Sequence, residues 1–202
     1  YTNNISLNGG NEKIKYFVSL SSYNQNGIIE RTAYDRYNVR ANIDANIIDN
    51  FSLSVNLAAE EGKNKQPGLS AGLGNSYCSI FSQAMLAYPI IPAFTSDGKY
   101  NGTQNIGNGN QSPLAARDLS GQQITRNSNF EGSITAKYSV PFIKGLDLKV
   151  TAAYDKGYSI KKAEMLPYNI NVWNQATRQY NETYARHALD GEASVQQWFS
   201  DI

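Results

Sequence analysis

The chain has 202 residues, a net charge of +1 at pH 7 and a single cysteine, Cys78. This charge gives no electrostatic case for nucleic acid or acidic lipid as the main partner, and one cysteine excludes an internal disulfide framework. No segment approaches the roughly 20 consecutive apolar residues of a membrane-spanning helix. A mean hydropathy of −0.49 does not exclude membrane strands, because their alternating apolar residues average out as polar.

Alternation of apolar and polar residues, which predicts β-strands, runs through much of the chain. Residues 1–7 already have the pattern of a strand, and Asp201 and Ile202 fall inside another, so we expect an internal piece of a longer protein. Strands of roughly ten residues match tilted membrane-spanning β-strands. The predicted apolar rows are Ile14, Tyr16, Val18 and Leu20; Tyr37, Val39, Ala41, Ile43, Ala45 and Ile47; Phe51, Leu53, Val55, Leu57 and Ala59; Phe130, Ile134, Ala136 and Tyr138; and Leu146, Leu148, Val150, Ala152 and Tyr154.

The connections between these strands alternate between short and long. Short ones are predicted at 9–12, 48–50 and 141–145, and long ones at 25–35, 62–126 and 157–190. In an up-and-down antiparallel sheet this places every short turn at one end and every long loop at the other, as in outer-membrane barrels. The pattern also predicts a helix over Asn75–Tyr88 in the largest loop, ended by Pro89 and Pro92.

A soluble β-sandwich would alternate in the same way, and period two alone favours it. Three features favour a barrel instead. The strands are longer than the roughly five or six residues usual in sandwiches, and the short and long connections lie at opposite ends of the strands. Aromatic residues such as Phe51 and Tyr138 also lie near strand ends. We therefore predict an all-β fold, an antiparallel up-and-down transmembrane β-barrel segment with long extracellular loops, one of which carries a short helix. A compact globule with Val39, Ile43, Leu53 and Val55 buried against a second sheet would contradict this prediction.

Particular stretches support a family resemblance. The stretch from Gly9 to Leu20 (GGNEKIKYFVSL), followed by Tyr23–Ile29 (YNQNGII), closely resembles the SusC/RagA class of TonB-dependent transporters. The resemblance continues at Tyr37–Asp44, at Asp97–Tyr100 (DGKY) and at Tyr138–Leu146.

The resemblance implies a barrel of about 22 strands in the outer membrane of a Gram-negative bacterium. Residues 1–202 would be part of that one barrel domain, with the plug domain and the other strands elsewhere. The whole protein would contact the TonB complex through its N-terminal part, carry a SusD-like surface lipoprotein as a lid, and import oligosaccharides or peptides. No cofactor is implied.

Two groups of side chains are candidate sites. Aromatic rings stack on sugars and amides bind hydroxyls, so we expect Phe94, Tyr100, Asn101, Trp173 and Asn174 in the loops to contact substrate. Loop self-packing or contact with the lid protein is the alternative for each of them. A second group is expected to face the lumen and contact the plug, with hydration of a wet wall as the alternative: Arg36, Arg40, Asp44, Glu60, Glu131 and Lys137.

Enzymatic chemistry is not expected. His187 is the only histidine and Cys78 the only cysteine, and neither lies in a catalytic or metal-binding motif. A calcium site at Asp97 would rest on one carboxylate, and Gly68–Gly74 lacks the Gly-Lys-Ser/Thr ending of a phosphate-binding loop. The alternative to import is an exported β-rich module that binds glycans or mediates adhesion without transport.

Overall fold

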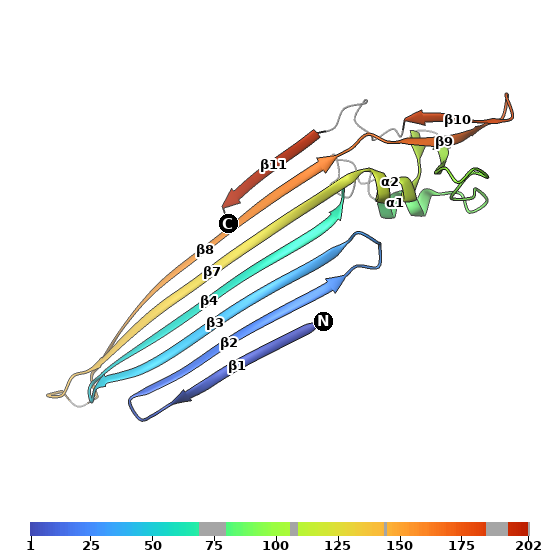
Figure 1. Cartoon of the computed structure of the whole chain (residues 1–202). Helices are drawn as coiled ribbons and strands as arrows, with labels where there is room; N and C mark the ends of the chain where they lie inside the picture. Colours follow the sequence, from blue (N-terminus) through green and yellow to red (C-terminus); the bar gives the residue numbers. More distant parts are fainter. Residues whose placement is uncertain (69–79, 106–108, 144, 185–193, 202) are drawn as a thin grey trace.

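The computed structural model describes residues 1–68, 80–105, 109–143, 145–184 and 194–201. Its main element is a seven-stranded antiparallel sheet in which the strands follow chain order, β1-β2-β3-β4-β7-β8-β11 (Figure 1). The short turns lie together at one end of this sheet, and the helices and remaining strands lie at the other. The strands of the sheet are β1 (Thr2–Gly10), β2 (Ile14–Asn26), β3 (Ala33–Ile48), β4 (Phe51–Pro67), β7 (Gly121–Ser139), β8 (Asp147–Met165) and β11 (Ser194–Asp201).

The strands extend further toward the loop end than the sequence predicts. β4 reaches Pro67 and β7 begins at Gly121, and the loop predicted at 25–35 is confined to 27–32. The loops predicted at 25–35 and 62–126 are therefore too long at both ends. The loop predicted at 157–190 begins too early, because β8 continues to Met165, and ends too early, because β11 begins at Ser194. The reason is that polar residues predominate on both faces of the β4 and β7 extensions, so these segments show no clear alternation, yet their backbones pair with one another in register.

The two faces of the sheet differ as the alternation predicts. Between β4 and β7 the register is unbroken from Phe51↔Tyr138 to Pro67↔Gln122, so residues opposite each other share a face. Val39 is 46% exposed and Ile43 is 42% exposed, while Leu53 and Val55 are half-buried by their neighbours within the sheet. Within the described ranges no second sheet covers this face. Full burial of an aliphatic side chain is worth about 1.5–3 kcal/mol, and these side chains are about half exposed, so covering each of them with an apolar surrounding is worth about 1 kcal/mol and the whole row favours one.

No helix in the described part of the chain is long and apolar enough to cross a membrane.

A small folded unit lies at the loop end of the sheet (Figure 1). It contains α1 (Ile80–Leu86), α2 (Pro113–Leu119) and a four-stranded sheet in the order β10-β9-β5-β6. In this unit β5 pairs with β9 in parallel, through Asn101↔Asn171. The strands are β5 (Asn101–Asn105), β6 (Gly109–Gln111), β9 (Asn169–Asn174) and β10 (Gln179–Tyr184), and the core consists of Ile80, Ala115, Ala116, Tyr168 and Ile170.

The predicted helix is confirmed for 80–86, whereas its first part, 75–79, lies outside the described residues. The second helix, α2, was not predicted, although its start carries local signals. The side chain of Ser112 caps the helix by accepting a hydrogen bond from the Ala115 amide at 3.5 Å, and Pro113 occupies the first turn. The loop unit therefore has a hydrophobic core of its own, and among the described residues the large sheet contributes none of the members of this core.

Candidate functional site

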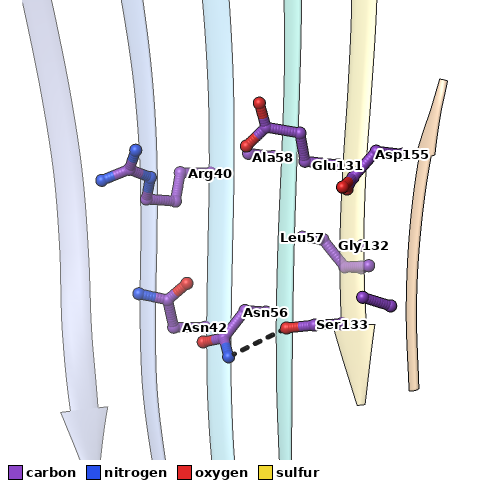
Figure 2. A pocket seen from close by; sticks show the side chains of 10 residues that line it. Arg40, Asn42, Asn56, Leu57, Ala58, Glu131, Gly132, Ser133 and Asp155 are labelled. Atoms are coloured by element: carbon purple, nitrogen blue, oxygen red, sulfur yellow. Dashed lines mark hydrogen bonds between the residues drawn. The ribbon is translucent and has the colours of Figure 1, made fainter. Parts of the chain in front are cut away.

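The polar face of the large sheet carries rows of side chains that run across the strands. Register places Ser19, Arg40, Ala58, Glu131 and Asp155 in one such row. Arg40 and Glu131 lie two strands apart with only Ala58 between them, a separation of about 10 Å between backbones. These three residues line a hollow of about 340 Å³. Figure 2 shows Glu131 and Asp155 on one side of it and Arg40 on the other.

A second hollow, of about 420 Å³, adjoins the first on the same face. Arg36, Arg40, Glu60 and Glu131 line it, together with serine and asparagine side chains. Within the described residues none of these four forms an ion pair, and the Nε atom of Arg36 is buried without a hydrogen-bond partner. The face thus presents separated charges of both signs to whatever lies against it.

The other two predicted lumen residues lie nearer the short turns. Asp44 pairs with Lys15 and Ser54 across the sheet, so it shares the polar face. The Nζ atom of Lys137 lies 2.9 Å from Oδ2 of Asp147. The structure therefore brings Arg36, Arg40, Glu60 and Glu131 together and leaves Asp44 and Lys137 outside the two hollows.

The predicted loop aromatics form two separate pairs. Phe94 and Tyr100 bridge across a turn with ring centroids 5.3 Å apart, and Phe94 is 46% exposed. Trp173 is 48% exposed and meets Tyr180 edge to face at 5.1 Å. Tyr180 was not predicted, because its position opposite Trp173 depends on the β9–β10 pairing.

The two predicted asparagines have local structural partners. Asn101 is 5% exposed, and its side-chain oxygen accepts a hydrogen bond from the amide of Gly102 at 3.0 Å. The side-chain oxygen of Asn174 accepts from the amides of Ala176 and Thr177 and so shapes the β9–β10 turn. Of the predicted loop residues, Phe94 and Trp173 present the exposed ring surface.

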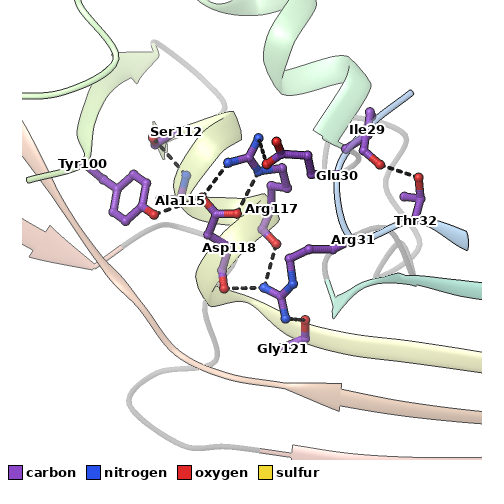
Figure 3. A network of polar contacts seen from close by, with 10 residues as sticks. All are labelled: Ile29, Glu30, Arg31, Thr32, Tyr100, Ser112, Ala115, Arg117, Asp118 and Gly121. Carbon is purple, nitrogen blue, oxygen red and sulfur yellow. Dashed lines mark hydrogen bonds and ion pairs between the residues drawn. The ribbon is translucent and has the colours of Figure 1, made fainter. Parts of the chain in front are cut away.

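A polar network joins the β2–β3 turn to α2 (Figure 3). Arg31 donates to the main-chain carbonyls of Arg117, at 2.9 Å, and of Asp118, at the C-terminal end of α2, where a cation is favourable. Arg117 pairs with Glu30 at 2.9 Å and with Asp118 at 2.7 Å. Sequence reasoning missed this network because Glu30 and Arg31 lie more than 80 residues before Arg117 and Asp118 in the chain.

Hydrogen bonds explain the altered acidities in the network. The Arg117 guanidinium holds the pKa of Asp118 below its usual value, against the opposing effect of partial burial. The hydroxyl of Tyr100 donates to Oδ2 of Asp118 at 2.9 Å, and this bond raises the pKa of the phenol. The network therefore ties the Phe94–Tyr100 pair to the end of α2 through a charged carboxylate.

Cys78 and His187 lie outside the described residues. Among the residues that are described, no three histidine, cysteine, aspartate or glutamate side chains are grouped as a metal site.

Comparison with known proteins places this sheet in a family. The chain is 30% identical over 142 residues, 69% of its length, to TonB-dependent receptor P26 of Formosa agariphila. It is 24% identical over 201 residues, 87% of its length, to TonB-dependent receptor SusC of Bacteroides thetaiotaomicron. It spans 13% and 19% of these two relatives, respectively. No protein-family model matches the chain. The chain accordingly belongs to the TonB-dependent receptors of the outer membrane, as a β-barrel segment.

Proposed function

We propose that the whole receptor imports oligosaccharides or peptides across the outer membrane with energy from the TonB complex, and that residues 1–202 form one arc of its barrel wall. The observation that supports this most is the contrast between the two faces of the sheet. One face exposes aliphatic side chains such as Val39 and Val150, and the other carries water-compatible hollows around Arg40 and Glu131. A wall with these two faces separates lipid from an aqueous interior.

In this proposal the charged side chains of the polar face contact the plug. Arg36, Arg40, Glu60 and Glu131 carry opposite charges that form no ion pairs within the described residues, so a plug surface with complementary charges would satisfy them. Asp44 and Lys137 would take part nearer the short turns. Pairs of this kind are weak enough, at about 1 kcal/mol or less each in a wet surrounding, to break during each transport cycle.

Substrate capture is assigned to the loop unit. Phe94, Trp173 and Tyr180 offer exposed rings on which sugar faces or peptide side chains can stack. Tyr100, Asn101 and Asn174 support them through the bonds described above. A SusD-like lipoprotein over this end would enclose the captured substrate, as the resemblance to SusC-type receptors suggests.

The test uses the full-length receptor in its native host. Growth on a panel of defined oligosaccharides and oligopeptides as single carbon sources identifies the nutrient that requires the receptor gene. We expect loss of growth on that nutrient when either the receptor or TonB is removed. Trp173→Ala should slow its uptake at low concentration, whereas Trp173→Phe, which keeps a ring, should retain most of it. A receptor that binds a glycan but leaves growth on every nutrient unchanged would refute import and favour an adhesion module.

A further inference from the structure

An apolar pocket lies on the polar face of the large sheet, at its loop end. It has a volume of about 500 Å³ and is enclosed by the β2–β3 turn, the end of β4 and the start of α1. Register places Gln25, Tyr34 and Asn64 in one row across β2, β3 and β4, and alternation puts this row on the same face as Arg36 and Arg40. In the barrel this face borders the lumen, so the pocket lies at the mouth of the lumen.

Aliphatic side chains form one side of the pocket. Ile80 belongs to the core of the loop unit, and Ile29 packs against that core. Ile28, in contrast, is fully exposed at the rim. An isoleucine surrounded by water gains the free energy of apolar burial only when a further group covers it. The pocket is therefore an apolar site that a ligand would complete.

Uncharged amide side chains form the other side of the pocket. Gln25, Asn64 and Gln66 line it, and none of its described lining residues carries a charge. Within the described ranges the side chains of Asn64 and Gln66 have no hydrogen-bond partner. A primary amide both donates and accepts hydrogen bonds, as the main chain of a peptide does. The lining therefore favours a neutral ligand with donors and acceptors beside an apolar group.

The lining favours a peptide over a sugar. Sugar rings are bound well by the open face of an aromatic side chain. Tyr34 is the only aromatic residue among the described lining residues, and its ring already lies 6.3 Å from that of Tyr23. A branched aliphatic side chain, by contrast, matches the isoleucine side of the pocket in shape and polarity.

Hydrogen bonds fix the turn that forms the isoleucine side. The amide of Gly27 donates to the carbonyl of Thr32 at 2.9 Å, and the amide of Thr32 donates to the carbonyl of Ile29 at 3.2 Å. Arg31 of the same turn donates to the carbonyls at the end of α2. The turn is thus positioned before a ligand arrives, which reduces the entropy cost of binding.

We propose that this pocket binds an aliphatic side chain of a neutral oligopeptide, and that the nutrient of the receptor is accordingly a peptide. The side chain would lie between Ile28 and Ile80. Asn64 and Gln66 would form hydrogen bonds with the peptide main chain beside it. This inference rests on the proposed import function and adds the class of substrate to it.

The experiment measures peptide binding to the full-length receptor by isothermal titration calorimetry. The receptor is held in lipid nanodiscs, because detergent tails could occupy an apolar pocket. The probes are acetylated and amidated Gly-Gly-X-Gly-Gly peptides in which X is alanine, valine or leucine, and a neutral maltooligosaccharide is the comparison. Affinity should rise about fourfold for each carbon added to X, because burial of a methylene is worth about 0.8 kcal/mol.

Two pairs of variants test whether the peptides bind in this pocket. Ile28→Ser should weaken binding of the leucine peptide about tenfold and reduce the dependence on X. Ile90→Ser, at another exposed isoleucine that does not line the pocket, should bind as the wild type does. Asn64→Ala should weaken all three peptides about fivefold, for one lost hydrogen bond. Asn56→Ala, on the same face of β4 but in the hollow around Arg40, should leave their affinity unchanged.

The outcomes separate the peptide assignment from import itself. Equal affinity for the alanine and leucine peptides would overturn the proposal, and so would unchanged binding of the leucine peptide to Ile28→Ser. Binding of the maltooligosaccharide that Ile28→Ser weakens would also overturn it and would identify a sugar site. If growth on an oligosaccharide requires the receptor and no peptide of the series binds, the peptide assignment is wrong while import stands. Growth that requires the receptor on no nutrient would instead refute import.

Discussion

An arginine on the outward face should destabilise the barrel far more than the same arginine one residue away. Ile134 lies at the middle of the apolar face, opposite Val55 and Ala152, and is 50% exposed. Val55 is the central member of the row from Phe51 to Ala59, so either edge lies about 13 Å away along the strand, or about 10 Å in depth for a tilted strand. An arginine at this depth reaches the interface only in part.

The magnitude follows from this depth. Arginine near the middle of a bilayer costs a barrel about 2–4 kcal/mol, which corresponds to about a 30- to 1,000-fold change in the folding equilibrium. Ser133 lies on the polar face, where it lines the hollow with Glu131 and Asp155 and accepts a hydrogen bond from Asn56 at 3.4 Å. Ser133→Arg should therefore change stability by no more than about 1 kcal/mol.

The assay is urea unfolding of the full-length receptor in lipid vesicles, followed by tryptophan fluorescence and by the mobility of unheated samples on gels. Both variants add the same side chain to neighbouring positions of β7, so strand propensity and length are matched. An equal or larger loss of stability for Ser133→Arg than for Ile134→Arg would refute the assignment of the two faces.

Three further predictions concern the loop end and the edges of the sheet. Arg31→Ala removes the hydrogen bonds to the last carbonyls of α2. It should raise the hydrogen-exchange rates of the amides of residues 112–121 by about fivefold, which corresponds to a loss of about 1 kcal/mol in local stability. The control Arg178→Ala, in the β9–β10 turn, should leave these exchange rates unchanged. The pKa of Asp118 is lower in the folded protein than its ordinary value of 3.8, so the stabilisation by this carboxylate is complete above that value and is lost as the pH falls through the lower folded value. Asp118→Asn should therefore show the faster hydrogen exchange already at pH 7 and should lose this acid transition. An acid transition that persists in the variant would contradict the role of this carboxylate. Residues 1–202 expressed alone in detergent-free buffer should aggregate, since the outer edges of β1 and β11 have no partner strand within the described residues, and recovery of a monodisperse, protease-resistant monomer would argue against the barrel assignment.

Local pattern predicts the wall well and the loop unit poorly. The apolar rows through Val39 and Leu53 could be read directly, because side chains of a strand alternate between its faces by backbone geometry alone. The core around Ile80, Ala115 and Ile170 could not, because its members come from segments far apart in the chain and show no common period. The capping signal at Ser112 and Pro113 was present in the sequence and would have identified α2.

The candidate site residues also differ in how much of their surroundings could be predicted from the sequence. Trp173 could be selected as an exposed loop aromatic, but its partner Tyr180 depends on how β9 pairs with β10. The position of Asn101 in the chain suggested a binding residue, and only the packing of β5 against β9 shows that its side chain is enclosed.

The sequence by itself determined that the chain forms long amphipathic strands with an apolar face and a wet face, because period two is a property of each strand alone. Only the tertiary structure decided which charges become neighbours. Lys63 meets Arg126, and Arg40 faces Glu131 across Ala58, because strand register joins segments separated by dozens of residues. Register is set by the pairing of whole strands, and no single segment encodes it.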